Sequence, residues 1–145
     1  MAAQRIDPFA NFRFRVEIDG ITQAGFTECT GLGSIIEVVD YREGGEGTPV
    51  RKIPGRVKYP DIVLRWGVTT SHELYDWHRA VIHGQLQRKN GAVILLDGKG
   101  AEVLRWNFFE AWPSRWDGPT LNAMTNNVAI ESLTITCESQ EQVTS

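Results

Sequence analysis

The side chains that could take part in catalysis are few and scattered along the sequence. His72 and Asp76 stand four residues apart, a spacing that lets two side chains touch on one face of a helix. A surface pair of this kind is usually a solvated contact. His78 and His83 have no carboxylate or nucleophile partner in the sequence pattern, and neither a Gly-x-Ser-x-Gly nor a His-Glu-x-x-His motif occurs. We therefore expect no catalytic residues and no enzymatic activity.

The two cysteines and the glycine run offer no cofactor chemistry either. Cys29 and Cys137 lie far apart, without CxxC spacing and without a zinc-type histidine pattern around them. Two buried, reduced thiols are the expected state. The run of glycines at 44–47 lacks the Lys-Ser/Thr that completes a phosphate-binding loop. The sequence predicts no metal and no cofactor.

The five tryptophans suggest one binding alternative. Trp66, Trp77 and Trp106 fall on apolar faces and are expected in the core. Trp112 and Trp116 flank a proline, where they could form the platform of a carbohydrate-binding β-sandwich. The simpler interpretation is that they anchor a loop on the rest of the domain.

Composition and charge narrow the range of partners. The chain has 145 residues, enough for one domain, with 15 basic and 18 acidic side chains spread without long runs of either sign. Stable nucleic-acid binding draws on clustered Lys and Arg, so the net charge of −3 argues against it. No apolar run approaches the roughly 20 residues that span a bilayer, and the first residues lack a secretory pattern. We expect cytoplasmic synthesis and no membrane anchor.

Hydrophobic periodicity predicts a mainly β protein with one helix. Phe12, Phe14, Val16 and Ile18 alternate with polar residues, as in a strand with one buried face. Thr70 and Glu73 have the spacing of a capping box, which predicts a helix over 71–83. The expected strands cover 11–19, 24–29, 35–41, 57–66, 92–96, 103–112 and 127–138.

Three segments are expected to be irregular. Residues 42–55 combine glycines and prolines with charged residues and cannot bury enough apolar surface to order alone. This segment is either a mobile loop or one that orders against a partner. Residues 114–126 form a second loop, and 139–145 a flexible C-terminal tail.

These elements predict one domain in which two packed antiparallel sheets form a β-sandwich or barrel, with one flanking helix. In the last strand, apolar residues change from even positions (Val128, Ile130) to odd ones (Leu133, Ile135). Such a change indicates a bulge or a strand that turns a corner between two sheets. Several strands are long and lack a central proline, so their edges could pair with other copies around a ring.

Read together, several segments resemble the tail tube protein family of contractile phages and extracellular contractile injection systems. The resemblance runs in the family's order over nearly the whole chain, and its segments are Asp7-Pro8-Phe9, 12–20, 25–32, 41–44, 51–55, Tyr75-Asp76-Trp77, Ala111-Trp112-Pro113, Leu121-Asn122-Ala123 and 128–131. The resemblance implies a phage tail tube-like fold, similar also to the haemolysin-coregulated tube protein of type VI secretion.

The resemblance also implies a function and a set of partners. Hexameric rings of this subunit would stack into a tube around a lumen that holds cargo. That tube would lie inside a contractile sheath and end at a baseplate, spike and tube initiator, in a virion tail or a released phage-tail-like particle. A tube-initiating or baseplate-proximal subunit is the alternative within the same fold.

The resemblance assigns the segment at 42–55 to contacts between subunits or rings. Candidate interface residues are Tyr41, Arg42, Glu43, Glu46, Arg51, Lys52 and Pro54. Arg13, Arg15 and Glu17 are candidates for an exposed, polar strand face.

Overall fold

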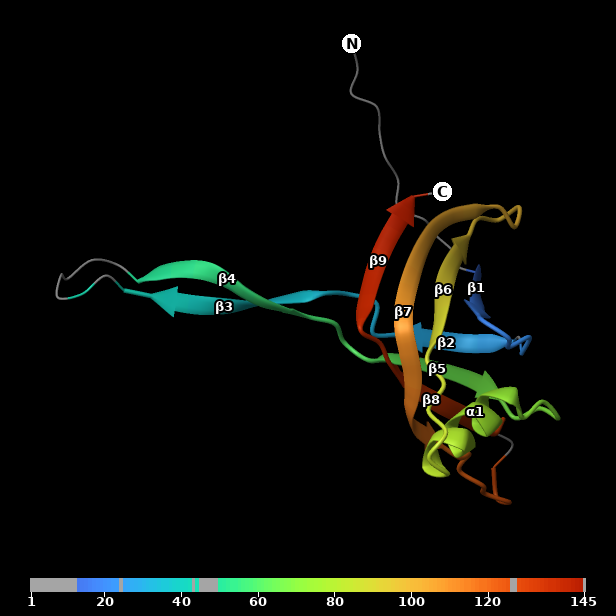
Figure 1. The fold of residues 1–145 in the computed structure, drawn as a ribbon. Coiled ribbons are helices and arrows are strands. Elements are labelled where there is room, and N and C mark those ends of the chain that lie inside the picture. Colours follow the sequence, from blue (N-terminus) through green and yellow to red (C-terminus); the bar gives the residue numbers. More distant parts are fainter. Residues whose placement is uncertain (1–12, 24, 43, 45–49, 126–127, 145) are drawn as a thin grey trace, which may run out of the picture.

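Nine strands and one helix make up the part of the chain that the computed structural model describes, residues 13–23, 25–42, 44, 50–125 and 128–144 (Figure 1). The elements in chain order are β1 (Arg13–Ile18), β2 (Phe26–Thr30), β3 (Ile35–Tyr41), β4 (Arg51–Lys58), β5 (Ile62–Gly67), α1 (Glu73–Ile82), β6 (Lys89–Leu96), β7 (Glu102–Asp117), β8 (Ile130–Thr136) and β9 (Ser139–Thr144). The predicted fold class, mainly β with one helix, is confirmed.

The long strand β7 joins two layers of antiparallel sheet. Its first part pairs with β6 on one side and β9 on the other, and β6 pairs in turn with β1. Its last part pairs with β8, which continues through β5 to β2. Pro113 was expected to end this strand, but β7 runs on to Asp117. The strand can continue because Pro113 pairs with Ile135 at an irregularity in register, where the missing N–H of proline is tolerated.

The chain turns the corner between the layers at Glu110. This residue has φ of 51°, and its N–H donates to the Asn90 side-chain oxygen at 2.9 Å. The opposing strand bends at the same level, where the Glu138 N–H donates to the Phe109 carbonyl between β8 and β9 at 3.0 Å. The change of apolar positions between Ile130 and Leu133 marks neither the predicted bulge nor the predicted corner, because β8 pairs with β5 in regular register from Ile130 to Ile135. The corner lies after β8.

The core fills the space between the two layers. Strand β5 shows the expected alternation, with Ile62, Leu64 and Trp66 almost fully buried. The other members of the buried cluster are Ile18, Leu74, Trp77, Val93, Phe108, Ala111, Leu133 and Ile135.

The helix α1 lies within the predicted range but begins differently. Its N-cap is His72, whose side chain makes no capping hydrogen bond, so the predicted Thr70 capping box is wrong. The Glu73 carboxylate instead accepts hydrogen bonds from the Thr22 N–H at 2.9 Å and the Thr22 hydroxyl at 3.1 Å. This contact fixes the helix to the segment after β1. In the described residues, no helix has the length and apolar character needed to cross a membrane.

All three predicted irregular segments contain strand residues, and 114–117 belong to the end of β7. Residues 51–55 of the expected loop belong to β4, and the expected C-terminal tail forms β9. Neither β4 nor β9 has a strong alternating apolar pattern. Each strand is ordered instead by backbone pairing with a neighbour, β4 with β3 and β9 with β7.

Candidate assembly interface

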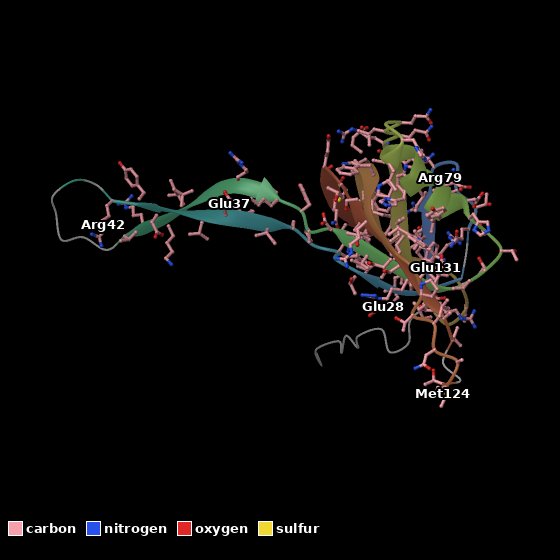
Figure 2. The ribbon with its side chains drawn as sticks, turned by 90° about the horizontal axis from the view of Figure 1, so that it is seen from below. Glu28, Glu37, Arg42, Arg79, Met124 and Glu131 are labelled. Carbon is pink, nitrogen blue, oxygen red and sulfur yellow. The ribbon has the colours of Figure 1, made fainter. Side chains whose placement is uncertain are left out.

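Strands β3 and β4 form a two-stranded sheet of their own, and this β3–β4 hairpin projects away from the two main layers (Figure 1; Figure 2). An isolated two-stranded hairpin is at best marginally stable in water. Sheets of three or more strands, or packing against another element, supply the missing stability. The geometry of this hairpin therefore indicates a covering partner.

The hairpin exposes large apolar side chains. Val38 is 65% exposed and Val39 is 43% exposed. The remaining exposed apolar residues of the hairpin are Ile35, Ile36, Tyr41, Ile53 and Val57. Contiguous exposed apolar surface of this kind marks interaction sites in folded proteins.

Both faces of the hairpin are apolar, as the strand register shows. Residues directly opposite each other share a face. Ile36 pairs with Val57 and Val38 with Pro54, which defines the Val38 face. On the other face of the hairpin, Val39 pairs with Ile53 and Tyr41 pairs with Arg51. These residues define the Val39 face.

A bulge shapes the hairpin near its base. The register shifts between Ile36 and Val38, so β4 has one more residue than β3 at this point. A Cβ on Gly55 would lie 2.7 Å from Val39 Cγ2 and 3.2 Å from the Glu37 carbonyl oxygen, so a larger residue here would require Val39 and the bulge to shift. An ion pair between Lys58 and Glu37 joins the two strands beside the bulge.

The hairpin brings together most of the predicted interface residues. Tyr41 lies opposite Arg51, Lys52 opposite Asp40, and Pro54 opposite Val38. Arg42 follows directly after β3 (Figure 2). The predicted residues Glu43 and Glu46 lie outside the described part of the chain.

Sequence reasoning missed the apolar residues of the hairpin. The signal was the pair of adjacent apolar residues Ile35-Ile36, followed by Val38-Val39. Apolar side chains at both odd and even positions indicate a strand covered on both faces.

A second exposed surface covers the layer formed by β1, β6, β7 and β9. Arg15 and Glu17 point to this face with an ion pair of 3.3 Å, and Glu17 also lies 3.7 Å from Arg105. Arg105 in turn contacts Glu102 at 2.7 Å. The surface is thus polar, with the charges of Arg15, Glu17, Arg105 and Glu102 paired. Arg13 lies on the same side of β1 as Arg15 and Glu17. β1 and β9 are the two edges of the layer.

The groups first considered for catalysis are not assembled into a site. His72 interacts with Asp76 through its backbone carbonyl, and His78 Nδ1 lies 3.1 Å from the Pro113 carbonyl oxygen. Within the described ranges, no group of three His, Cys, Asp or Glu side chains could hold a metal.

The cysteines are free thiols with little nucleophilic character. Burial and, to a smaller extent, the nearby Glu28 carboxylate together raise the pKa of Cys29 to about 12. Burial also raises the pKa of Cys137. Both groups are therefore protonated thiols at neutral pH, as expected for structural cysteines.

The tryptophans considered for sugar binding lie on a strand. Trp112 and Trp116 belong to β7 and are half-buried. The Trp116 ring packs against Tyr75 of α1, with ring centroids 4.8 Å apart. The ring thus holds the helix against β7, and neither tryptophan lies in the loop that the simpler interpretation expected it to anchor.

Similarity to known proteins covers almost the entire chain. A family described as T4-like virus tail tube protein gp19 matches residues 10–141. A chain in a structure of the anti-feeding prophage baseplate, 6-fold symmetrised, is 26% identical, with a TM-score of 0.85 over 97% of this chain and 98% of that chain. A chain in the sheath–tube complex of the extracellular contractile injection system PVC, in the extended state, is 25% identical, with a TM-score of 0.84 over 95% and 93%.

More distant similarity concerns the fold alone. Hcp1 from Flavobacterium johnsoniae is 14% identical, with a TM-score of 0.52 over 90% of this chain and 99% of that chain. No curated protein sequence matches the chain.

Proposed function

This chain belongs to the T4-like virus tail tube protein family, and from that premise we propose that its copies form hexameric rings that stack into the inner tube of a contractile particle. It is a structural tube subunit of the contractile injection system type. The observation that carries the proposal is the projecting β3–β4 hairpin, whose two apolar faces have no cover within the described part of the chain.

Lateral ring contacts would use the edges of the layer formed by β1, β6, β7 and β9. Neighbouring strands in this layer are antiparallel, so β1 and β9 run in opposite directions. Rotation about a ring axis preserves strand direction along that axis. The β9 edge of one copy would thus meet the β1 edge of the next in antiparallel orientation, and closing the ring would leave no free edges in this layer.

In such a ring, the polar face that carries Arg13, Arg15 and Glu17 would line the lumen. Four of its charges are paired within the subunit, through the contacts of Glu17 with Arg15 and Arg105 and of Arg105 with Glu102. A lumen of paired charges would let cargo slide without holding it, and it would not bind nucleic acid stably.

Axial contacts between rings would use the hairpin. Tyr41, Arg42, Arg51, Lys52 and Pro54 would contact a neighbouring copy together with the apolar residues around them. Glu43 and Glu46, at the end of the same segment, belong to the proposed interface by their place in the sequence. The charged members would set the register between rings, while apolar burial would supply most of the affinity.

The partners of similar chains suggest those of this one. The structures they belong to are a sheath–tube complex, a baseplate and a tube-terminating cap. We infer that this subunit is made in the cytoplasm, joins a sheath and a baseplate, and performs no catalysis. A baseplate-proximal role is a second candidate, since one similar chain lies in a baseplate structure.

Negative-stain electron microscopy of the purified protein over a range of concentrations tests the proposal. Rings or stacked tubes with an open centre are the expected result. If the sample stays monomeric, the same measurement with sheath and baseplate proteins follows. Absence of rings there as well would reject the tube subunit assignment for this chain.

A further inference from the structure

A second group of exposed apolar side chains lies outside the hairpin. We call it the end patch, and its members are Val68, Leu121, Met124, Val128 and Ile130. Leu121 is 82% exposed and Met124 is 92% exposed. The exposed large apolar residues in the described part of the chain that belong neither to the hairpin nor to the end patch are Ile82 and Leu86. Nearly all such surface is therefore divided between two sites.

Hydrogen bonds hold the end patch in place. The Val68 N–H donates to the Ala129 carbonyl at 3.0 Å, which fixes the segment after β5 beside the segment before β8. The Met124 N–H donates to the Asn122 side-chain oxygen at 2.9 Å. This turn presents Met124 to solvent at the tip of the β7–β8 connection. A side chain held outward in this way is available to a partner.

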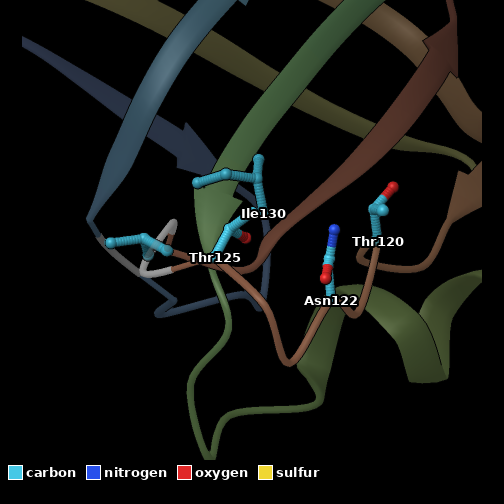
Figure 3. A pocket seen from close by; sticks show the side chains of 5 residues that line it. Thr120, Asn122, Thr125 and Ile130 are labelled. Carbon is cyan, nitrogen blue, oxygen red and sulfur yellow. The ribbon is translucent and has the colours of Figure 1, made fainter.

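The end patch is also hollowed. Thr120, Asn122, Thr125, Val128 and Ile130 line a concavity of about 300 Å³ (Figure 3). The lining combines the apolar side chains of Val128 and Ile130 with hydroxyl and amide groups. Such a surface fits a strand that carries aliphatic side chains and has a free edge. The apolar residues can contact the aliphatic side chains, and the hydroxyl and amide groups can form hydrogen bonds with the unpaired backbone groups of that edge.

The hairpin and the end patch have matching chemistry and lie apart on the molecule. In Figure 1 and Figure 2 the hairpin projects to the left, and the β7–β8 connection, with Met124 labelled in Figure 2, lies at the lower edge of the two layers. Strands β3 and β4 carry four basic and two acidic residues. Residues 117–131 include two acidic residues, Asp117 and Glu131, and no basic one. Charge and hydrophobicity are thus both complementary between the two sites.

We propose that the end patch of one copy receives the β3–β4 hairpin of a second copy. The inference rests on the proposed tube function and names the acceptor surface for the hairpin. The contact is heterologous, because donor and acceptor are different surfaces of the same chain. Each ring would then offer hairpins on one side and end patches on the other, and the tube would have a direction of growth.

Mixing two variants tests this pairing. Val38→Glu with Val39→Glu places charge on both faces of the hairpin, and Met124→Glu places charge on the end patch. All three side chains are exposed, so both variants should fold, as circular dichroism would check. Each variant alone should give rings that do not stack. Their mixture should give pairs of rings but no tube of more than two rings. The Met124→Glu ring supplies the intact hairpins and the hairpin variant supplies the intact end patches, so only one interface can form. Ile82→Glu, at a site that is 65% exposed but outside both surfaces, should stack like the wild type.

The alternative outcomes are distinct. Long tubes from Met124→Glu alone would overturn the end patch as acceptor and leave the tube function intact. Unpaired rings in the mixture would overturn it too. Crosslinking gives an independent readout: in wild-type-like tubes, Val38→Cys and Met124→Cys on different copies should join through a flexible bismaleimide. Tubes without this crosslink would contradict the proposal. Failure of the wild type to form rings with its sheath and baseplate would instead reject the proposed function.

Discussion

At the scale of single residues, close approaches fix the fold more tightly than the sequence pattern suggests. Gly91 in β6 lies directly opposite Phe108 on the neighbouring strand β7. A Cβ at this position would lie 2.4 Å from the Glu17 carbonyl oxygen and 2.4 Å from Phe108 Cζ. Both neighbours are held on adjacent strands, so neither can move without disturbing the layer.

Gly91→Ala should therefore destabilise the monomer by about 1–3 kcal/mol, as overpacking of a filled core does. Gly98→Ala is the matched control, because a Cβ there meets no atom within 4 Å, and its effect should stay within about 0.5 kcal/mol. Urea unfolding monitored by tryptophan fluorescence measures both. Equal stability of the two variants would contradict this packing.

The Cys29 thiol should make stability depend on pH in the alkaline range. Its pKa is raised from 9.0 to about 12 in the folded protein, so above pH 9 the unfolded chain loses this proton while the folded chain keeps it. Folding stability should then fall as pH rises from 9 towards 12, by at most about 1.4 kcal/mol per pH unit from this group. Urea unfolding of wild type and Cys29→Ala at pH 8, 9.5 and 10.5 measures the difference in slope. Parallel declines in the two proteins would show that the thiol does not contribute.

At the scale of elements, the sequence predicts those that bury one face and fails for those that depend on a partner strand. β1 and β5 follow from alternation, since Val16 and Leu64 must avoid water while their neighbours need not. β4 was predicted as a loop because Pro54 and Gly55 are poor strand residues, yet pairing with β3 orders them. β9 has a polar sequence, so only its pairing with β7 reveals it.

The same limit applies to the candidate interface. Charged residues such as Arg51 and Lys52 could be proposed as interface residues, because they lie in a segment whose composition does not allow it to fold alone. The apolar faces could not, because a one-residue bulge at Gly55 decides which side chains share a face. The acceptor surface around Met124 depends on a turn and on the packing of Val68 beside it, which no local pattern encodes.

Both faces of the hairpin should be needed for assembly. Val38→Ser and Val39→Ser each remove apolar surface from one face, and both side chains are exposed in the monomer. We expect unfolding free energies within about 0.5 kcal/mol of the wild type, and weaker stacking in both variants. Sedimentation velocity over a concentration series measures the stacking. If only one substitution weakened it, the hairpin would be covered on a single face.

At the scale of the whole molecule, the arrangement of surfaces matches the demands of a tube. The lateral edges β1 and β9 bound one layer, while the hairpin and the end patch lie apart from each other, the hairpin projecting from the layers and the end patch at their lower edge in Figure 1. Edge pairing would close a ring, and heterologous docking would stack rings in one direction. The remaining surface of the layer, with its paired charges, would be left facing the lumen.

The charge pairing of that surface gives a test of its position. Glu17 lies within 4 Å of both Arg15 and Arg105, so Glu17→Gln would leave two arginines without this carboxylate in every copy. The pair is exposed, and its loss should cost the monomer little stability. If this face lines the lumen, repetition around each ring would concentrate the freed positive charge in a narrow channel. Tubes of the variant should then retain short single-stranded DNA, with an affinity that falls steeply as salt rises, whereas wild-type tubes should not.

Glu28→Gln provides the matched control for this experiment. Glu28 pairs with Arg65 at 2.6 Å on the other layer, so its loss frees an arginine away from the proposed lumen. Fluorescence anisotropy of labelled DNA, with tubes verified by microscopy, should detect binding for Glu17→Gln and none above wild type for Glu28→Gln. Equal binding by the two variants would mean that the face carrying Glu17 is not enclosed, because enclosure is what distinguishes a concentrated ring of arginines from the same charge spread over an outer surface.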